Sequence, residues 1–249
     1  MVAVLFISLI IFMALGLPIA VSICFATLAS MISAGSGNLF MVAQKMVTAM
    51  DATTLLAIPL FILAGAIMGK GGISKRIIDL SYELFGWIPG SLGIVCVVSC
   101  MFFAALSGSS PATVAAIGGI MVPAMIDDGY PAGFSCSVAA AGGIIGCIIP
   151  PSIPFVNYGL ITGESVGDLF AGGILPGILM GVALCVLVSI KSKKNGWGTT
   201  TKGINLWNLL NAFVRSILAL LMPVIILGGI YGGFFTPTEA AAVACIYGI

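Results

Sequence analysis

Two polar interruptions stand in an otherwise apolar part of the chain, and their residues could surround a cation with oxygen atoms. The first is Ser107–Pro111, which lies inside a run without charged residues from Leu84 to Ile126. The second is Gly142–Ser152, which ends in two consecutive prolines and a serine. Freed carbonyls and hydroxyls at broken membrane helices coordinate ions in secondary transporters. We therefore expect the two interruptions to face each other and form a transport site.

The composition is that of an integral membrane protein. Of 249 residues, 60% are hydrophobic and only 7% are charged, whereas ordinary globular domains carry about 25% charged residues. The formal net charge of +1 predicts no nucleic-acid partner, and membrane lipids are the expected surroundings. The chain has no His and its seven cysteines lie in apolar segments without zinc-ligand spacing. These features indicate neither an enzyme nor a resident cofactor.

Membrane helices must position the two interruptions, so the predicted fold is all-α and multi-pass. The uncharged run 2–34 is interrupted at Gly16–Pro18 and predicts two short helices or one kinked helix. Thr53–Gly69 is the next span. The predicted regions are scaffold helices at 1–70, an amphipathic interfacial arm helix at 71–88, the transport core at 89–168, a transmembrane helix at 169–190, a cytoplasmic loop at 191–210, and a further helix pair at 211–249.

Within the core we interpret residues 89–126 as a re-entrant hairpin and residues 131–160 as a broken helix. The positive-inside rule places both Lys70–Arg76 and the basic stretch Lys191–Lys202 in the cytoplasm. An even number of crossings must then separate them. A hairpin with no net crossing, one broken span and one intact span satisfy this requirement.

A short repeat relates the two ends of the chain. An apolar helix, a glycine and a helix that begins at proline occur around Gly16–Pro18 and again around Gly233–Pro237. We interpret the chain as the first of two inverted-topology repeats plus the start of the second. We therefore expect this polypeptide to be an incomplete transporter, with a second hairpin and a second double-proline break beyond Ile249. At the second proline, Glu239 is predicted to cap a helix that follows Thr236.

Four motifs in the sequence together resemble those of one known family. They are Ala57–Gly65, Phe103–Ser109, Ile149–Ile153 and Phe235–Ala242. Together they resemble the large membrane subunit, the DctM type, of tripartite ATP-independent periplasmic (TRAP) transporters. The matches extend over nearly the whole chain and follow the order in which the family has them.

The resemblance implies a sodium-driven importer in the bacterial cell inner membrane that works by an elevator-type movement. A small membrane subunit and a soluble periplasmic binding protein would complete the transporter. The binding protein would deliver a small carboxylated substrate, such as a C4-dicarboxylate or a sialic acid.

The resemblance also implies a sodium site between the hairpin tip and the facing broken helix. Its residues are Ser107, Ser110, Gly146, Ile149 and Pro150, the last three acting through backbone oxygens.

Close to these, Ser109, Thr113 and Asn157 are candidates to contact the substrate, and Tyr158 is a further one. Half-helix N-termini at Pro111 and Pro151 would also present free N–H groups and a positive dipole end to its carboxylate. The alternative is structural: small residues let helices pack closely, and serines bond back to the preceding turn.

A different class of function stays open at this point. Glycine-rich helices would suffice for a non-transporting structural subunit of a membrane complex. Sodium-dependent uptake that requires a separate binding protein distinguishes the two classes, because a structural subunit would show none.

Overall fold

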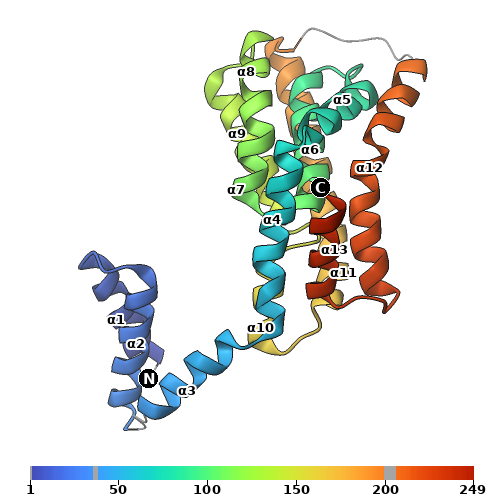
Figure 1. Cartoon of the computed structure of the whole chain (residues 1–249). Coiled ribbons are helices and arrows are strands. Elements are labelled where there is room, and N and C mark those ends of the chain that lie inside the picture. Colours follow the sequence, from blue (N-terminus) through green and yellow to red (C-terminus); the bar gives the residue numbers. More distant parts are fainter. Residues whose placement is uncertain (1, 36–38, 199–205) are drawn as a thin grey trace. The chain divides into compact units, whose positions relative to one another are not determined.

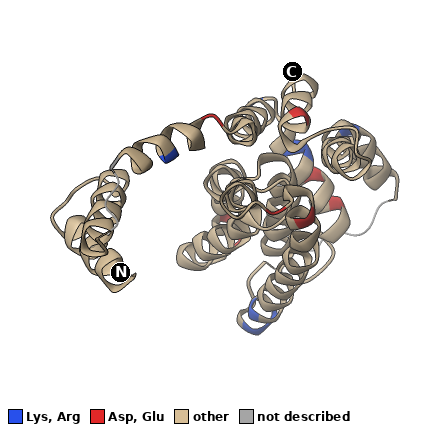
Figure 2. Ribbon diagram, turned by 90° about the horizontal axis from the view of Figure 1, so that it is seen from below, with Lys and Arg blue, Asp and Glu red and all other residues tan. Residues whose placement is uncertain are grey.

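The computed structural model describes residues 2–35, 39–198 and 206–249, and in these ranges every regular element is a helix (Figure 1). The prediction of an all-α protein is therefore confirmed. Four helical stretches are long and apolar enough to cross a membrane: Thr53–Lys70, Ser110–Asp127, Val166–Asn195 and Leu206–Tyr231. Charged residues are few along the ribbon (Figure 2).

The first of two compact units, Met1–Ala52, contains a helix pair. Helices α1 (Val2–Ala14) and α2 (Ile19–Ser33) pack on each other, with the rings of Phe12 and Phe25 5.7 Å apart. Gly16 joins them with φ 79°, a left-handed conformation that favours glycine. The run 2–34 is thus two short helices. A third helix, α3 (Leu39–Met50), follows and was not expected.

The second unit, Thr53–Ile249, holds both polar interruptions. Its elements are a 3₁₀ turn at Thr53–Leu56, α4 (Ala57–Lys70), α5 (Ile73–Phe85), α6 (Ser91–Ser107), α7 (Ser110–Thr113), a π-helical turn at Val114–Gly118, α8 (Gly119–Asp127), α9 (Ala132–Ile144), a 3₁₀ turn at Ile145–Cys147, α10 (Ile153–Thr162), α11 (Val166–Asn195), α12 (Leu206–Tyr231) and α13 (Pro237–Tyr247).

The first interruption is the turn of a helical hairpin. Helix α6 runs to Ser107, and the returning arm consists of α7, the π turn and α8, which pack along α6. The second interruption separates α9 from α10. Helix α6 also packs on α9, so the two interrupted elements are neighbours.

A row of small residues on α11 lets this helix approach the second interruption. A Cβ atom at Gly173 would clash with the Ile148 carbonyl and the Phe155 ring, and one at Gly177 would lie 2.5 Å from the Ile149 side chain. Gly181 follows at the same spacing against Met101. Glycine at these positions therefore allows direct helix-to-break contact.

Helix α13 lies between α4 and α12. Thr238 Oγ1 donates to the Thr53 carbonyl (3.2 Å), and Tyr247 donates to the Leu218 carbonyl of α12 (3.0 Å). At its start, Glu239 N–H donates to Thr236 Oγ1 (3.4 Å), while the Glu239 carboxylate accepts from Thr236 N–H (2.8 Å). This reciprocal capping confirms the role predicted for Glu239.

Two helices are longer than the sequence indicated. Helix α11 continues past Ile190 to Asn195, so the first residues of the predicted loop 191–210 are helical. Lys193 and Lys194 favour this, because cations stabilise the last turn of a helix. Helix α12 begins at Leu206 rather than near Phe213. Lys202 of the predicted loop and Ser36–Asn38 of the first loop lie outside the described residues.

The glycine row on α11 gives a stability prediction. Gly173→Ala should lower the free energy of unfolding by about 1–3 kcal/mol, because the added methyl meets the Ile148 backbone and a packed ring. Gly172→Ala is the matched control, since a methyl there would meet no atom of the described residues within 4 Å. Thermal unfolding in detergent micelles measures both. Equal transition temperatures for the two variants would show that the close packing of α11 on the second interruption does not stabilise the protein.

Candidate functional site

The hairpin tip is built from two residues between α6 and α7. Gly108 ends α6 in a left-handed conformation (φ 60°), and Ser109 is extended before the chain becomes helical again at Ser110. Thr113 N–H and Thr113 Oγ1 both donate to the Ser109 carbonyl, at 3.0 Å and 2.9 Å. The hydroxyls of Ser107 and Thr113 are 3.1 Å apart, and both side chains are buried. The tip is therefore internally bonded.

Glycine at position 108 lets the tip touch the second interruption. A Cβ atom at Gly108 would lie 2.5 Å from the Pro151 carbonyl oxygen. Ile153 N–H, the first of α10, donates to the Gly108 carbonyl at 3.2 Å. The two interruptions predicted to face each other are thus in direct backbone contact.

The second interruption follows from the proline pair. In an α-helix the N–H groups of residues 150 and 151 would bond to the carbonyls of Gly146 and Cys147. Proline has no N–H, so both carbonyls lose their partners. The Ser152 hydroxyl replaces one of them by donating to the Cys147 carbonyl at 2.6 Å. Within the described part of the chain, no hydrogen bond reaches the Gly146 carbonyl.

Several predicted sodium ligands come together here. The Ser110 hydroxyl lies 2.9 Å from Cys147 Sγ and 3.5 Å from the Ile144 carbonyl. A Cβ atom at Gly146 would lie 3.0 Å from Thr113 Oγ1 and 3.3 Å from the Ser109 carbonyl. The hairpin hydroxyls and the end of α9 therefore share one small region. Hydroxyl and carbonyl oxygens are the donors that hard cations prefer.

Ile149 and Pro150 continue the break. The Ile149 N–H donates to the Ile145 carbonyl (2.9 Å), and the Ile149 side chain packs on Gly177 of α11. Pro150 is buried, and the peptide bond that joins it to Pro151 is cis. Neither carbonyl accepts a hydrogen bond from any described residue.

The three substrate candidates occupy different surroundings. Ser109 borders a hollow of about 380 Å³ between α4 and the hairpin. Thr113 is fully buried and bonded to Ser107 and Ser109. Asn157 is exposed on α10, as is Tyr158, and no hydrogen bond of the described residues joins either side chain to the tip. Of the three candidates, only Ser109 borders the hollow beside the tip.

A lysine borders this hollow, and from the sequence it was expected only to mark the cytoplasmic side of the membrane. Lys70, at the end of α4, borders it together with the small residues Gly65, Gly69 and Ala112. Cys147 and Ser152 are two further residues that the sequence analysis did not single out, although they bond Ser110 and repair the break. Because Pro151 has no N–H group, the sequence indicates that the Cys147 carbonyl needs another donor, which the nearby Ser152 hydroxyl supplies.

The start of α10 differs from expectation. The proline at position 151 predicts the N-terminus of a half-helix that offers free N–H groups to an acid. The helix begins at Ile153, and its first donors are taken: Ile153 N–H bonds to Gly108, and Phe155 N–H to Ser152 Oγ (3.4 Å). Position 154 is a proline without a donor. The N–H groups of Ile153 and Phe155 at this helix end therefore bond to other groups of the protein.

Comparison with known proteins identifies one family. Residues 6–249 match the family described as "Tripartite ATP-independent periplasmic transporter, DctM component". The match covers all of the elements described above from within α1 onward.

Individual relatives are similar over the same length. The chain is 48% identical over 96% of its length to the isethionate TRAP transporter permease protein DctMQ of Oleidesulfovibrio alaskensis, of which it covers 38%. It is 45% identical over 99% of its length to the C4-dicarboxylate TRAP transporter large permease protein DctM of Vibrio cholerae, covering 54%. The sialic acid TRAP transporter large permease protein SiaM of Vibrio cholerae is 39% identical over 94% of the chain, with 55% covered. The chain thus spans about half the length of the curated relatives it matches, and less of the first.

The repair of the break by Ser152 can be tested. Ser152→Ala should lower the free energy of unfolding by about 1–3 kcal/mol, because the partly buried Cys147 carbonyl loses its donor and α10 loses its cap. Ser137→Ala is the control, since that hydroxyl is exposed and bonds only back to the Gly133 carbonyl (2.7 Å). Chemical unfolding in micelles compares the two. A loss at Ser152 no larger than at Ser137 would contradict the repair.

Proposed function

The chain belongs to the DctM component family of tripartite ATP-independent periplasmic transporters, a family of multi-pass membrane permeases, and on this premise we propose that it carries a sodium site and a substrate path for the uptake of small organic acids. The family is one of transporter components and not of enzymes. The observation that carries the proposal is the direct contact between hairpin tip and helix break, from Ile153 N–H to the Gly108 carbonyl.

Sodium binds between the tip and the break. The Ser107 and Ser110 hydroxyls supply oxygens from the hairpin, and the carbonyls of Gly146, Ile149 and Pro150 supply them from the other side. The proposal is supported by the carbonyls that the prolines leave without hydrogen bonds. A carbonyl at membrane depth gains most from a cation when no donor reaches it.

The substrate carboxylate binds in the hollow between α4 and the hairpin. Ser109 and Ala112 border this hollow at the start of α7, where the helix presents its positive end. Lys70 adds a full positive charge at the far end of the same hollow. The printed substrates of the relatives, isethionate, C4-dicarboxylates and sialic acid, are all small organic anions, in agreement with such a site. Thr113 acts by holding Ser107 and Ser109, and Asn157 would contact substrate from α10.

The hairpin and the broken helix move as one body against α4 in an elevator-type step. Hydrogen bonds tie the hairpin to the break through Gly108 and Ser110. By contrast, no hydrogen bond joins α4 to the hairpin in the described ranges, and small residues such as Gly65 and Ala112 border the hollow between them. A contact without directional bonds can slide more easily.

The hairpin re-enters the membrane from the cytoplasmic side. Helix α5, the last turns of α11 and the first turns of α12 lie at one end of the larger unit (Figure 1). The cations Lys70, Lys75, Arg76, Lys191, Lys193 and Lys194 belong to the elements that meet there. Their clustering supports a cytoplasmic location for this end.

An inverted repeat is supported by the turns after α1 and α12. Gly16 N–H bonds to the carbonyl three residues before it and Leu17 N–H to the carbonyl five residues before it, and Gly233 and Phe234 repeat this pattern. Both turns lead to a helix near a proline. A small membrane subunit and a periplasmic binding protein complete the transporter in the inner membrane. A purely structural subunit remains the alternative.

The sodium site predicts the behaviour of two serine variants. In the complete transporter, reconstituted with all of its subunits and its binding protein, Ser107→Ala or Ser110→Ala should raise the sodium concentration for half-maximal uptake about tenfold, which corresponds to the loss of about 1.4 kcal/mol of binding. Ser137→Ala should leave it unchanged. Wild-type sodium dependence in both tip variants would place the site elsewhere, and no sodium-dependent uptake by the unmutated transporter would favour the structural role.

The topology predicts opposite labelling of two surface positions. In a background without native cysteines, a cysteine at Lys75 should react with an impermeant thiol reagent only from the cytoplasmic side. A cysteine at Glu164, in the loop after α10, should react only from the periplasmic side, because the broken helix crosses once between them. Labelling of both positions from one side would overturn the crossing, and reversed labelling would overturn the orientation.

A further inference from the structure

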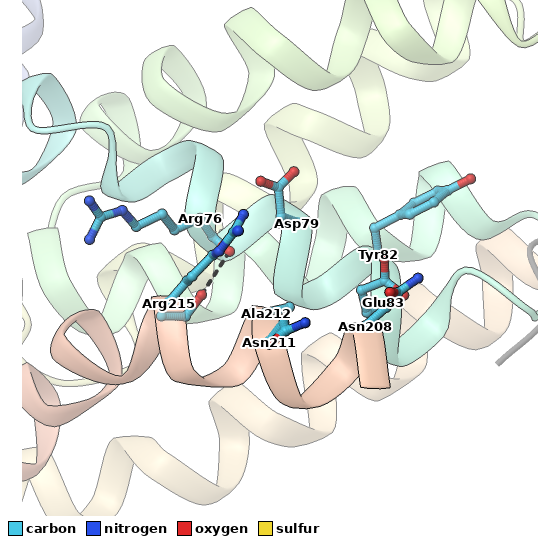
Figure 3. A pocket seen from close by; sticks show the side chains of 9 residues that line it. Arg76, Asp79, Tyr82, Glu83, Asn208, Asn211, Ala212 and Arg215 are labelled. Atoms are coloured by element: carbon cyan, nitrogen blue, oxygen red, sulfur yellow. Dashed lines mark hydrogen bonds between the residues drawn. The ribbon is translucent and has the colours of Figure 1, made fainter. Parts of the chain in front are cut away.

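A second polar hollow lies away from the hairpin, between α5 and α12 (Figure 3). Its volume is about 380 Å³, and the Ser216 hydroxyl of α12 donates to the Arg76 carbonyl of α5 at 3.0 Å beside it. The residues come from one stripe of each helix, among them Arg76, Asp79 and Glu83 from α5 and Asn208, Arg215 and Ser216 from α12.

The charges in this hollow are unevenly distributed. Figure 3 shows Arg76 and Arg215 at one end, with Asp79 beside Arg215, and Tyr82, Glu83 and Asn208 at the other. A neighbouring hollow of about 540 Å³ adds Lys75 beside the two arginines. In the ranges that the structure describes, neither Arg76 nor Arg215 forms an ion pair through its side chain. Asp79 is the carboxylate at this end, and with Lys75, Arg76 and Arg215 around it the arginine end keeps a net positive charge that an anion can neutralise.

The position of Arg215 along α12 places this site at a membrane boundary. Helix α12 has 26 residues and is thus about 39 Å long, more than the roughly 30 Å of the hydrocarbon core. With Tyr231 at the far boundary, Arg215 lies about 24 Å along the helix, a few ångströms inside the near boundary. An arginine there extends its guanidinium to the phosphate level. Burial of the charge in hydrocarbon would be costly.

The face of α12 beside the arginine is suited to acyl chains. Val214 and Leu218 lie next to Arg215 on the helix surface and are both exposed, and Trp207, two turns before Val214 on the same side, is exposed as well. Tryptophan concentrates at the interface of a bilayer. Cationic head-group ligands next to a row of exposed apolar side chains match both parts of a phospholipid, whereas an acidic side chain of another subunit would use only the cations.

We propose that Arg76 and Arg215 bind the phosphate group of an anionic phospholipid between α5 and α12. Guanidinium groups suit this ligand because they donate two parallel hydrogen bonds to phosphate oxygens. The lipid would connect the amphipathic α5 to a membrane span. This site is independent of sodium binding at the hairpin.

Native mass spectrometry of the 249-residue chain in detergent micelles tests the proposal with dioleoyl phosphatidylglycerol as the probe. The double variant R76Q/R215Q should raise the apparent Kd for this lipid about tenfold or more. The control K193Q/K194Q makes the same change in net charge at exposed positions on α11 and should change the Kd less than twofold. Dioleoyl phosphatidylcholine should bind weakly to all three proteins. An unchanged Kd in R76Q/R215Q would overturn the proposal.

Two further experiments distinguish a phospholipid from other ligands of this hollow. Inorganic phosphate or glycerol 3-phosphate in hundredfold excess should not displace the lipid, and full displacement would assign the site to a soluble phosphate instead. If R76Q/R215Q keeps its lipid but no longer copurifies with the small membrane subunit, the hollow is a protein interface and the lipid assignment is wrong.

A photoreactive phosphatidylglycerol that carries its diazirine on the head group needs no variant. Crosslinks to the unmutated chain should map to peptides from α5 and the first half of α12. Crosslinks confined to other helices would also overturn the proposal.

Discussion

The absence of an N–H group on proline is the constraint from which the candidate site follows. Pro150 and Pro151 remove two consecutive donors from what would otherwise be one helix. In a membrane each carbonyl that loses its donor must find another partner. Ser152 supplies one for Cys147. The Gly146 carbonyl has none among the described residues, which makes it the strongest backbone candidate for a cation.

Glycine determines which groups come close to this break. Gly108 allows the hairpin tip to approach the Pro151 carbonyl, and Gly173 allows α11 to approach the Ile148 carbonyl from another side. At Gly65 of α4, a Cβ atom would lie 3.1 Å from Cα and Cβ of Ser107. Three elements thus converge on the tip and the break because small residues remove the side chains that would separate them.

Much of this arrangement could be predicted from sequence, because it depends on local chemistry. The hairpin turn, the proline break and the Thr236–Glu239 cap are each formed by residues only a few positions apart in the sequence. They follow from turn and cap preferences. The bond from Ser110 to Cys147 spans 37 positions, and the contacts of α10 with Gly108 join separate helices. Such contacts depend on packing. The same limitation explains why α10 was expected to offer free N–H groups that the hairpin in fact occupies.

The hydrogen bonds within the hairpin tip are compatible with an ion beside it. A serine hydroxyl has one hydrogen to donate and two lone pairs to offer. When Ser107 donates to Thr113 Oγ1 or to the Ser109 carbonyl, its lone pairs remain available to a cation. Ser110 can likewise donate to Cys147 or to the Ile144 carbonyl. These bonds fix the oxygens in place before the ion arrives, which lowers the entropy lost on binding. A tip held in this way would bind sodium without having to rearrange, and the buried Thr113 contributes by keeping Ser107 and Ser109 in position.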